Sequence, residues 1–258
     1  MTAPIRVLDT GLAPARWNVA MTAALVRRHG DGLAPDSIRF HRYRTCVLIG
    51  NGQRVADAVD IGHCRRRGIE IARRVTGGGA VFISPRMLAW DVVLDRRSQA
   101  GTLDGLTRRI CEAVAAGLAQ LGAPARFDPP NAIVIDGAKI SGSSGIIEGG
   151  SAVLQGTVMI EDDVADMAGA LRMPEAVLRG RVSCLAAALA TVPPLAQVQA
   201  AIAGELAARL GRSLLHAEPD DAELACAEKL LGDEIGTDDY VFGSHPPASL
   251  EAAPEVVT

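Results

Sequence analysis

The stretch "RRVTGGGAVF" spans residues 73–82 and places two arginines and three consecutive glycines directly before an apolar run. Glycine loses more conformational freedom on folding than any other residue, so three in succession are entropically unfavourable. The stretch is therefore either a flexible turn or a loop whose main chain approaches a large polar group. Main-chain N–H groups that no side chain covers can surround an anion or an acyl carbonyl. Because neighbouring strand residues face opposite ways, only one of Arg73 and Arg74 is expected to face such a group.

Segments with strand and helix periodicity follow one another along the rest of the chain and predict an α+β protein. We expect a mostly antiparallel or mixed sheet with helices packed against it. Residues 80–85 and 87–95 are predicted to be two strands that pair with each other, and Asp136-Gly137 signals a hairpin turn. Further strands are expected at 37–43, 45–50, 69–75 and 151–161, and helices at 17–29, 55–68, 102–122 and 195–211. Thr102 is expected to cap the helix at 102–122.

Composition excludes several classes of protein. The net charge of −4 argues against a nucleic-acid binder, which usually carries a basic surface. No run of apolar residues is long enough to span a membrane and the N-terminus lacks a signal peptide, so we expect a cytoplasmic protein with no membrane partner. The five cysteines form no CxxC pair, which predicts neither a zinc site nor a disulfide framework. The Pro- and Ala-rich tail, residues 244–258, is expected to be disordered.

Two further segments contain candidate functional residues. Only two of the 26 basic residues are lysines, Lys139 and Lys229, so each is a candidate for chemistry that arginine cannot perform. Lys139 lies in "GAKISGSSG", between glycines and small hydroxyl residues, although a solvated hairpin lysine is the commoner interpretation. Gly156 interrupts the strand "LQGTVMI", which indicates either a β-bulge or the close approach of a ligand or another backbone.

The order and spacing of these three segments resemble the lipoate–protein ligase and octanoyltransferase family, relatives of biotin–protein ligases. The stretches "NVAMTAAL", "VLIGNGQRVADAVDIGHCRRRGIEIARR" and "AEKLLGDEIGTDDYVFG" agree as well, so the resemblance covers about residues 5–243. It implies a biotin/lipoate protein ligase catalytic domain over residues 1–243, with a fold like that of class II aminoacyl-tRNA synthetases. The small C-terminal accessory domain of many ligases is not expected here, which makes a separate accessory subunit a candidate partner.

The resemblance also implies an acyl site. Such ligases activate lipoate or octanoate with ATP and Mg²⁺ and transfer it to a lysine of a lipoyl-carrier protein, either a lipoyl domain or an H-protein-like carrier. Lys139 matches the lysine that contacts the reacting carboxyl group, where an ammonium stabilises developing negative charge. Magnesium ligands are not identified, and Asp91 is one acidic candidate near the glycines. The implied substrate-binding residues are Arg74, Gly77, Gly78, Gly79, Val81, Ser141, Gly142, Gly156 and Thr157.

Four positions depart from the family's pattern. Ile83, Ser84 and Met87 stand where many members have His, Asp and Asn, and Gln155 replaces the usual His. The adenylate contacts that those side chains make in other members are therefore not expected here. The altered positions also leave open a non-catalytic acyl- or biotin-binding regulator, although no helix-turn-helix precedes the domain.

Cysteine positions separate a ligase from a transferase. Octanoyltransferases of this family form an acyl-enzyme on a cysteine, and in one branch it stands where this chain has Arg126. Cys184 is the remaining candidate for an ATP-independent octanoyltransferase or amidotransferase, whereas Cys46, Cys64 and Cys111 are expected in the core. Without a cysteine at the expected place, the sequence favours the ATP-dependent ligase.

Overall fold

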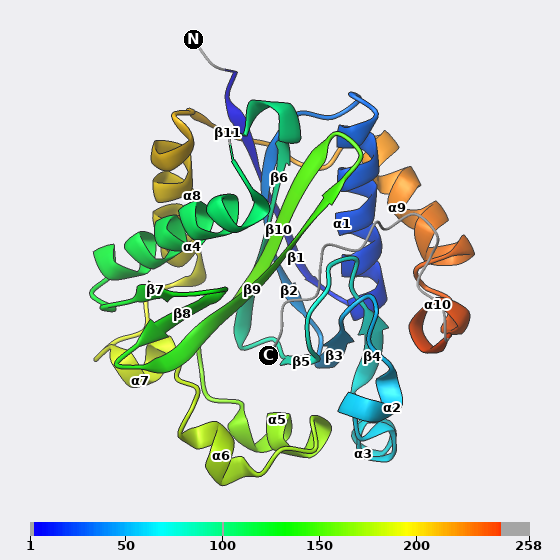
Figure 1. Cartoon of the computed structure of the whole chain (residues 1–258), viewed down its shortest axis with the longest axis vertical. Helices are drawn as coiled ribbons and strands as arrows, with labels where there is room; N and C mark the ends of the chain where they lie inside the picture. The colour runs from blue at the N-terminus through cyan, green and yellow to red at the C-terminus, as the bar shows by residue number, and fades with distance from the viewer. Residues whose placement is uncertain (1–2, 100, 244–258) are drawn as a thin grey trace.

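A computed structural model describes residues 3–99 and 101–243 (Figure 1). The tail predicted to be disordered, residues 244–258, lies outside the described residues. Two β-sheets and the helices around them form the structure, which confirms the predicted α+β class with a mixed sheet. No helix in the described ranges is both long and apolar enough to cross a membrane.

The large sheet has eight strands in the order β11-β1-β2-β6-β10-β9-β8-β7. Strand β1 runs parallel to β11 and β2, and every other neighbouring pair is antiparallel. The predicted hairpin between β8 and β9 is confirmed, because Asp136 and Gly137 both have positive φ. The strands are β1 (Ile5–Ala13), β2 (Ser37–Tyr43), β6 (Met87–Asp95), β7 (Arg126–Asp128), β8 (Ala132–Ile135), β9 (Ala138–Glu148), β10 (Ser151–Met159) and β11 (Leu214–His216).

The small sheet has the order β4-β3-β5 and corrects one prediction. Residues 80–85 and 87–95 do not pair with each other, because β5 pairs with β3 whereas β6 lies between β2 and β10. Both segments are buried along nearly their whole length, so their apolar pattern does not identify a partner. The strands are β3 (Cys46–Ile49), β4 (Glu70–Arg73) and β5 (Val81–Ile83).

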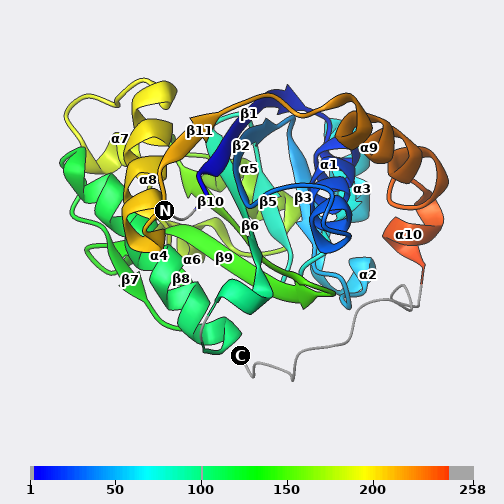
Figure 2. The ribbon, with the colours of Figure 1, turned by 90° about the horizontal axis from the view of Figure 1, so that it is seen from above.

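Helices cover both faces of the large sheet (Figure 2). Helices α4 and α8 lie on one side, and α1 and α9 lie on the other. The expected cap of α4 is confirmed, since the Thr102 side chain accepts a hydrogen bond from the Gly105 N–H. The predicted helix 55–68 divides into α2 and α3, because Val59 is extended and Asp60 caps α3. The helices are α1 (Ala15–Gly30), α2 (Val55–Ala58), α3 (Ile61–Arg67), α4 (Leu103–Gln120), α5 (Val164–Ala170), α6 (Glu175–Arg179), α7 (Leu185–Ala188), α8 (Leu195–Leu210), α9 (Asp221–Asp233) and α10 (Asp238–Phe242).

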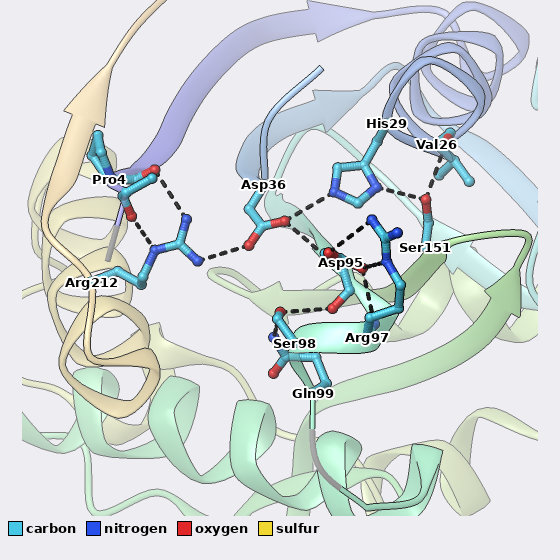
Figure 3. Close-up of polar contacts among 11 residues, drawn as sticks. Pro4, Val26, His29, Asp36, Asp95, Arg97, Ser98, Gln99, Ser151 and Arg212 are labelled. Atoms are coloured by element: carbon cyan, nitrogen blue, oxygen red, sulfur yellow. Dashed lines mark hydrogen bonds and ion pairs between the residues drawn. The ribbon is translucent and has the colours of Figure 1, made fainter. Parts of the chain in front are cut away.

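A buried polar cluster joins the end of α1 to three strands (Figure 3). His29 lies between Ser151 (Nδ1–Oγ 2.7 Å) and Asp36, whose Oδ1 accepts from Nε2 at 2.9 Å. The Asp95 N–H and the Arg212 guanidinium also donate to the Asp36 carboxylate. Ser151 is completely buried, so this Ser–His–Asp arrangement has no face open to a substrate. Its hydrogen bonds hold the end of α1 against the large sheet.

We predict that this buried cluster stabilises the fold less in acid than at neutral pH. Burial acts to raise the pKa of Asp36, but the hydrogen bonds from His29, Asp95 and Arg212 outweigh it and hold the pKa below its usual value. A lowered pKa adds stability above the ordinary aspartate pKa, and this stability is lost as the pH falls through the lowered value. Asp36→Asn should therefore lower the free energy of unfolding at pH 7 by about 1–3 kcal/mol and flatten its decline below about pH 4.

Denaturant unfolding at a series of pH values measures this effect. The exposed Asp31→Asn provides the matched control and should leave the acid limb unchanged. An Asp36→Asn protein with the same acid limb as the unsubstituted chain would contradict the assignment.

Candidate functional site

A β-bulge at Ile140 decides which way Lys139 points. The pairing of β9 with β8 shifts its register there and leaves Ile140 as the extra residue. The extra residue reverses the alternation of side chains, so Lys139 lies on the face of Gly142 rather than on that of Ser141. A Cβ built on Gly142 would lie 2.8 Å from Cε and 2.9 Å from Nζ of Lys139. The Lys139 side chain therefore lies across Gly142, where any larger residue would displace it.

The Lys139 ammonium has no carboxylate partner among the described residues. Its main chain is fixed on both sides, because its N–H donates to the Arg181 carbonyl (2.8 Å) and its carbonyl accepts from the Ser183 N–H (2.9 Å). Desolvation lowers the pKa of Lys139, and a smaller opposing effect comes from nearby Cys111. The side chain nevertheless remains reachable from solvent. Lys139 is thus a positioned cation that is open to an anionic ligand.

Residues 76–79, here called the glycine loop, contact the same face of β9. The Ser144 hydroxyl donates to the Gly77 carbonyl at 2.9 Å. Ser144 follows Gly142 by two residues, so both face the same side of the sheet. The structure therefore brings the glycine loop and Lys139 to one face of the large sheet.

The two arginines before the glycine loop diverge, as the strand pattern predicts. The Arg74 guanidinium donates to the carbonyls of Gly77 (2.6 Å) and Gly79 (2.8 Å), and burial lowers its pKa to about 10. Arg73 instead donates to carbonyls of the turn at 50–53 and of α10. Arg74, predicted to hold the ligand, therefore fixes the conformation of the glycine loop by donating to its carbonyl groups. Its buried positive charge has no carboxylate partner among the described residues.

The fold requires some of these glycines and not others. Gly78 has φ +93°, in the left-handed region that favours glycine. Gly50 lies directly against it, since a Cβ on Gly50 would be 1.9 Å from the Gly78 carbonyl oxygen. Gly77 and Gly79 have no such φ, and a Cβ on either would meet no atom within 4 Å. The fold therefore explains Gly78, whereas Gly77 and Gly79 leave open space beside their main chain.

A buried polar row lies under the glycine loop. Thr76 donates to Oε1 of Gln155 (3.0 Å), and Nε2 of Gln155 donates to Asp91 Oδ1 (2.9 Å). The other carboxylate oxygen of Asp91 accepts from Thr22 (2.8 Å) and Arg39 (3.2 Å). Asp91 is 1% exposed and both its oxygens accept hydrogen bonds from protein groups, which leaves this candidate poorly placed to coordinate magnesium. No group of three or more His, Cys, Asp or Glu side chains able to hold a metal occurs within the described ranges.

The residues that replace the family's usual side chains after the glycine loop lie in the interior. Ile83 and Met87 are buried in the core. The Ser84 hydroxyl donates to the buried Asp163 carboxylate and accepts from the Arg86 N–H. Ser84 thus stabilises the turn through which the chain passes from the small sheet to the large one.

Gly156 is explained by a side chain rather than by a ligand. A Cβ on Gly156 would lie 2.2 Å from the indole of Trp90, its partner on β6. Gly156 also pairs with Ser143, whose hydroxyl contacts the Cys111 thiol of α4 (3.1 Å). The direction in which a Gly156 side chain would point therefore faces α4, on the opposite side of the sheet from the glycine loop. Only its main chain remains available to the site.

Three other predicted positions differ in the face they occupy. Thr157 pairs with Gly142 and therefore shares its face with Lys139. Ser141 precedes Gly142 in a regular part of β9 and is buried on the opposite face, so its hydroxyl does not point toward the glycine loop. Val81 is half-buried in β5, directly after the glycine loop.

The cysteines are poorly placed for nucleophilic attack. Cys184 is 5% exposed and packs in the core, although it directly follows the segment bonded to Lys139. Burial raises the pKa of Cys111 to about 11. Arg126, where one branch has its cysteine, forms an exposed ion pair with Asp128 (3.0 Å). Cys46, Cys64 and Cys111 are buried, as predicted.

A cavity of about 350 Å³ lies away from this site, at the N-terminus of α1. It is lined in part by Pro14, Arg67 and Glu70. The Glu70 carboxylate accepts the N–H groups of Ala15 (2.7 Å) and Arg16 (3.1 Å), so its charge caps the helix. This cavity shares no lining residue with the face that carries Lys139.

Thr76 and Ser144 fix the glycine loop and were not predicted to do so. Thr76 stands directly before the three glycines, and Ser144 stands two residues after Gly142. Their hydroxyl groups were the available signal. Their partners depend on which strands pair, which local sequence does not reveal.

Comparison with known proteins identifies the family of the chain. Residues 14–207 match the model of the lipoyl protein ligase A/B catalytic domain. The chain belongs to this family. It is 27% identical to octanoyltransferase LipM of Symbiobacterium thermophilum, with 91% of this chain and 97% of that protein aligned. It is 29% identical to lipoate-protein ligase A subunit 1 of Thermoplasma acidophilum over 65% of this chain and 67% of that one. The chain is therefore an enzyme of the lipoate ligase and octanoyltransferase family.

Solved structures confirm the fold. A bi-partite lipoate protein ligase from Thermoplasma acidophilum, studied with its E2 lipoyl domain, superposes with a TM-score of 0.85 at 23% identity over the full length of both chains. A lipoate-protein ligase A bound with ATP gives a TM-score of 0.84 at 24% identity, covering 95% of this chain and all of that one. The architecture is that of the lipoate ligase catalytic fold.

The open space beside Gly79 generates a prediction. Gly79→Ala should change the free energy of unfolding by no more than about 0.5 kcal/mol, because the added methyl meets nothing. If a ligand's polar group lies against this main chain, the same change should lower acyl transfer by about 10- to 100-fold. Gly78→Ala is the contrasting variant and should destabilise the fold by about 1–2 kcal/mol. Full activity of Gly79→Ala would show that no ligand approaches there.

Proposed function

We propose that this chain is an ATP-dependent lipoate–protein ligase. It activates lipoate or octanoate to an acyl-adenylate and transfers the acyl group to a lysine of a lipoyl-carrier protein. The observation that carries this proposal is the Lys139 ammonium, which lies without a carboxylate partner on the face that the glycine loop contacts. A cation on the same face of the sheet as the glycine-loop main chain suits an acyl phosphate anhydride.

In this proposal each group acts on a different part of the adenylate. Lys139 stabilises negative charge on the phosphate during activation and on the carbonyl oxygen during attack by the acceptor lysine. Gly77 and Gly79 allow the ligand to approach the loop's main chain, and Arg74 holds the loop in shape from behind. Thr157 and Gly142 lie on the surface of the sheet beside the ammonium. Mg²⁺ enters with ATP, where phosphate oxygens supply much of its coordination.

Cysteine geometry supports the ligase over a transferase, even though relatives such as that of Symbiobacterium are named octanoyltransferase. Arg126 occupies the position of one branch's nucleophile and cannot form an acyl-enzyme. Reactive cysteines lie in partly exposed, electropositive surroundings, whereas Cys184 packs in the core.

A transferase remains the second candidate because of one contact. The Ser183 N–H donates to the Lys139 carbonyl, which holds Cys184 one residue away from the main chain of the lysine. This bond ties the segment that carries Cys184 to the strand that carries Lys139. The names of several relatives favour this candidate too.

The proposed partner is a lipoyl domain or an H-protein-like carrier that presents one lysine. A second polypeptide is a further proposed partner in the activation step, as the bi-partite archaeal ligase suggests by analogy. Supplying preformed lipoyl-adenylate tests this point, because transfer should then proceed without ATP or the second polypeptide.

Replacement of the site lysine tests its role. Lys139→Arg should lower acyl transfer by about 100-fold or more, since the bulkier guanidinium cannot lie across Gly142. Lys229→Arg, at the chain's other lysine, alters only an exposed pair with Asp233 and should keep full activity. Transfer of a lipoyl group to a lipoyl domain, followed by intact-protein mass spectrometry, measures both. Equal activity of the two variants would refute the assignment.

The source of the activated acyl group distinguishes the two candidates. With ATP, Mg²⁺ and lipoate or octanoate, the protein should accumulate bound acyl-AMP that mass spectrometry detects, with biotin as the negative control. Cys184→Ser should retain this activity, because the ligase route needs no thiol. ATP-independent transfer from an octanoyl-carrier thioester, trapped on the enzyme and lost in Cys184→Ser, would instead establish the transferase.

A further inference from the structure

The His41 side chain on β2 is buried without a hydrogen-bond partner. It is 1% exposed, and neither ring nitrogen has a partner among the described residues. Its Nδ1 lies 3.9 Å from Asp91 Oδ2, too far for a hydrogen bond, and its ring meets that of Tyr43 edge-on at 5.0 Å between centroids. Buried polar groups in native proteins are normally paired, so an unpartnered imidazole indicates a ligand or water that completes it.

Strand register places His41 in line with Lys139. His41 pairs with Ala89, Ala89 with Thr157, and Thr157 with Gly142, over which the Lys139 side chain lies. Residues directly opposite on neighbouring strands share a face, so all of these belong to one transverse row. Three strand spacings separate the two ends, roughly 14 Å between strand axes. Small residues thus connect an accessible cation to a buried imidazole.

The environment keeps this imidazole neutral. Burial and, to a smaller extent, the nearby Arg39 guanidinium lower the pKa of His41 to about 3, against an opposing effect of Asp91. A neutral imidazole has one N–H donor and one acceptor nitrogen. An all-hydrocarbon tail against His41 would leave both unpaired, whereas a heteroatom would pair with at least one.

We propose that His41 is a specificity-determining residue at the far end of the acyl site, where it hydrogen-bonds a heteroatom at the distal end of the acyl chain. The preferred substrates are then eight-carbon acids with sulfur or oxygen at that end, lipoate ahead of octanoate. The lipoyl disulfide offers weakly accepting, polarisable sulfur, which also packs well against the rings of His41 and Tyr43. This assignment rests on the proposed acyl-transfer function.

Direct binding of free acids to the whole chain tests it without requiring turnover. Isothermal titration calorimetry should show ω-hydroxyoctanoate binding about tenfold more tightly than octanoate, as one good hydrogen bond allows, and lipoate binding more tightly than octanoate by a smaller factor. His41→Leu should reduce both ratios to near one, chiefly by weakening the two heteroatom ligands. His41→Asn, which keeps a donor and an acceptor, should preserve part of the preference. The matched control is His216→Leu, at an exposed position of β11, and it should change nothing.

The outcomes separate this assignment from the proposed function. Equal binding of the three acids by the unsubstituted chain, or an unchanged ratio in His41→Leu, overturns the role of His41 alone. Failure of the unsubstituted chain to bind any of them overturns the acyl site together with this assignment. The ranking of ω-hydroxyoctanoate against octanoate on the unsubstituted chain decides the matter even if His41→Leu does not fold.

Discussion

The buried pair of Arg39 and Asp91 is the interaction on which the rest of the site depends. A buried ion pair compensates its desolvation only when further hydrogen bonds satisfy both partners. Here Asn18 and Thr22 of α1 engage the guanidinium, and Thr22 and Gln155 engage the carboxylate. One charge pair therefore fixes α1 against β2 and β6, and through Gln155 it also fixes the glycine loop.

The positive charges near the glycine loop lack the carboxylate partners that many surface charges have. The chain carries a net charge of −4, and most ion pairs away from the core are exposed and contribute little to stability. Around the glycine loop, by contrast, Arg73, Arg74 and Lys139 have no carboxylate partner in the structure described. Carbonyl groups satisfy the two arginines, which leaves a local excess of positive charge where an anionic ligand would bind.

Sequence patterns predicted the regular elements where their chemistry is local. The Thr102 cap of α4 and the Asp136-Gly137 turn have their partners within a few residues, so sequence identified both. The pairing of residues 80–85 with 87–95 was wrong because both segments are apolar on each face and β6 belongs to another sheet. The surroundings of Asp91 likewise depend on tertiary structure, since only the fold places Arg39 and Gln155 against its carboxylate.

By itself the sequence determined the α+β class and identified the glycine loop and Lys139 as candidate site groups. It also carried the family's motifs over most of the chain, because those motifs depend on residue type and spacing. Tertiary structure alone decided the direction of Lys139, the packing of Trp90 against Gly156 and the unpartnered state of His41. Side-chain direction in a strand depends on register with its neighbours, and a single bulged residue, Ile140, reverses it.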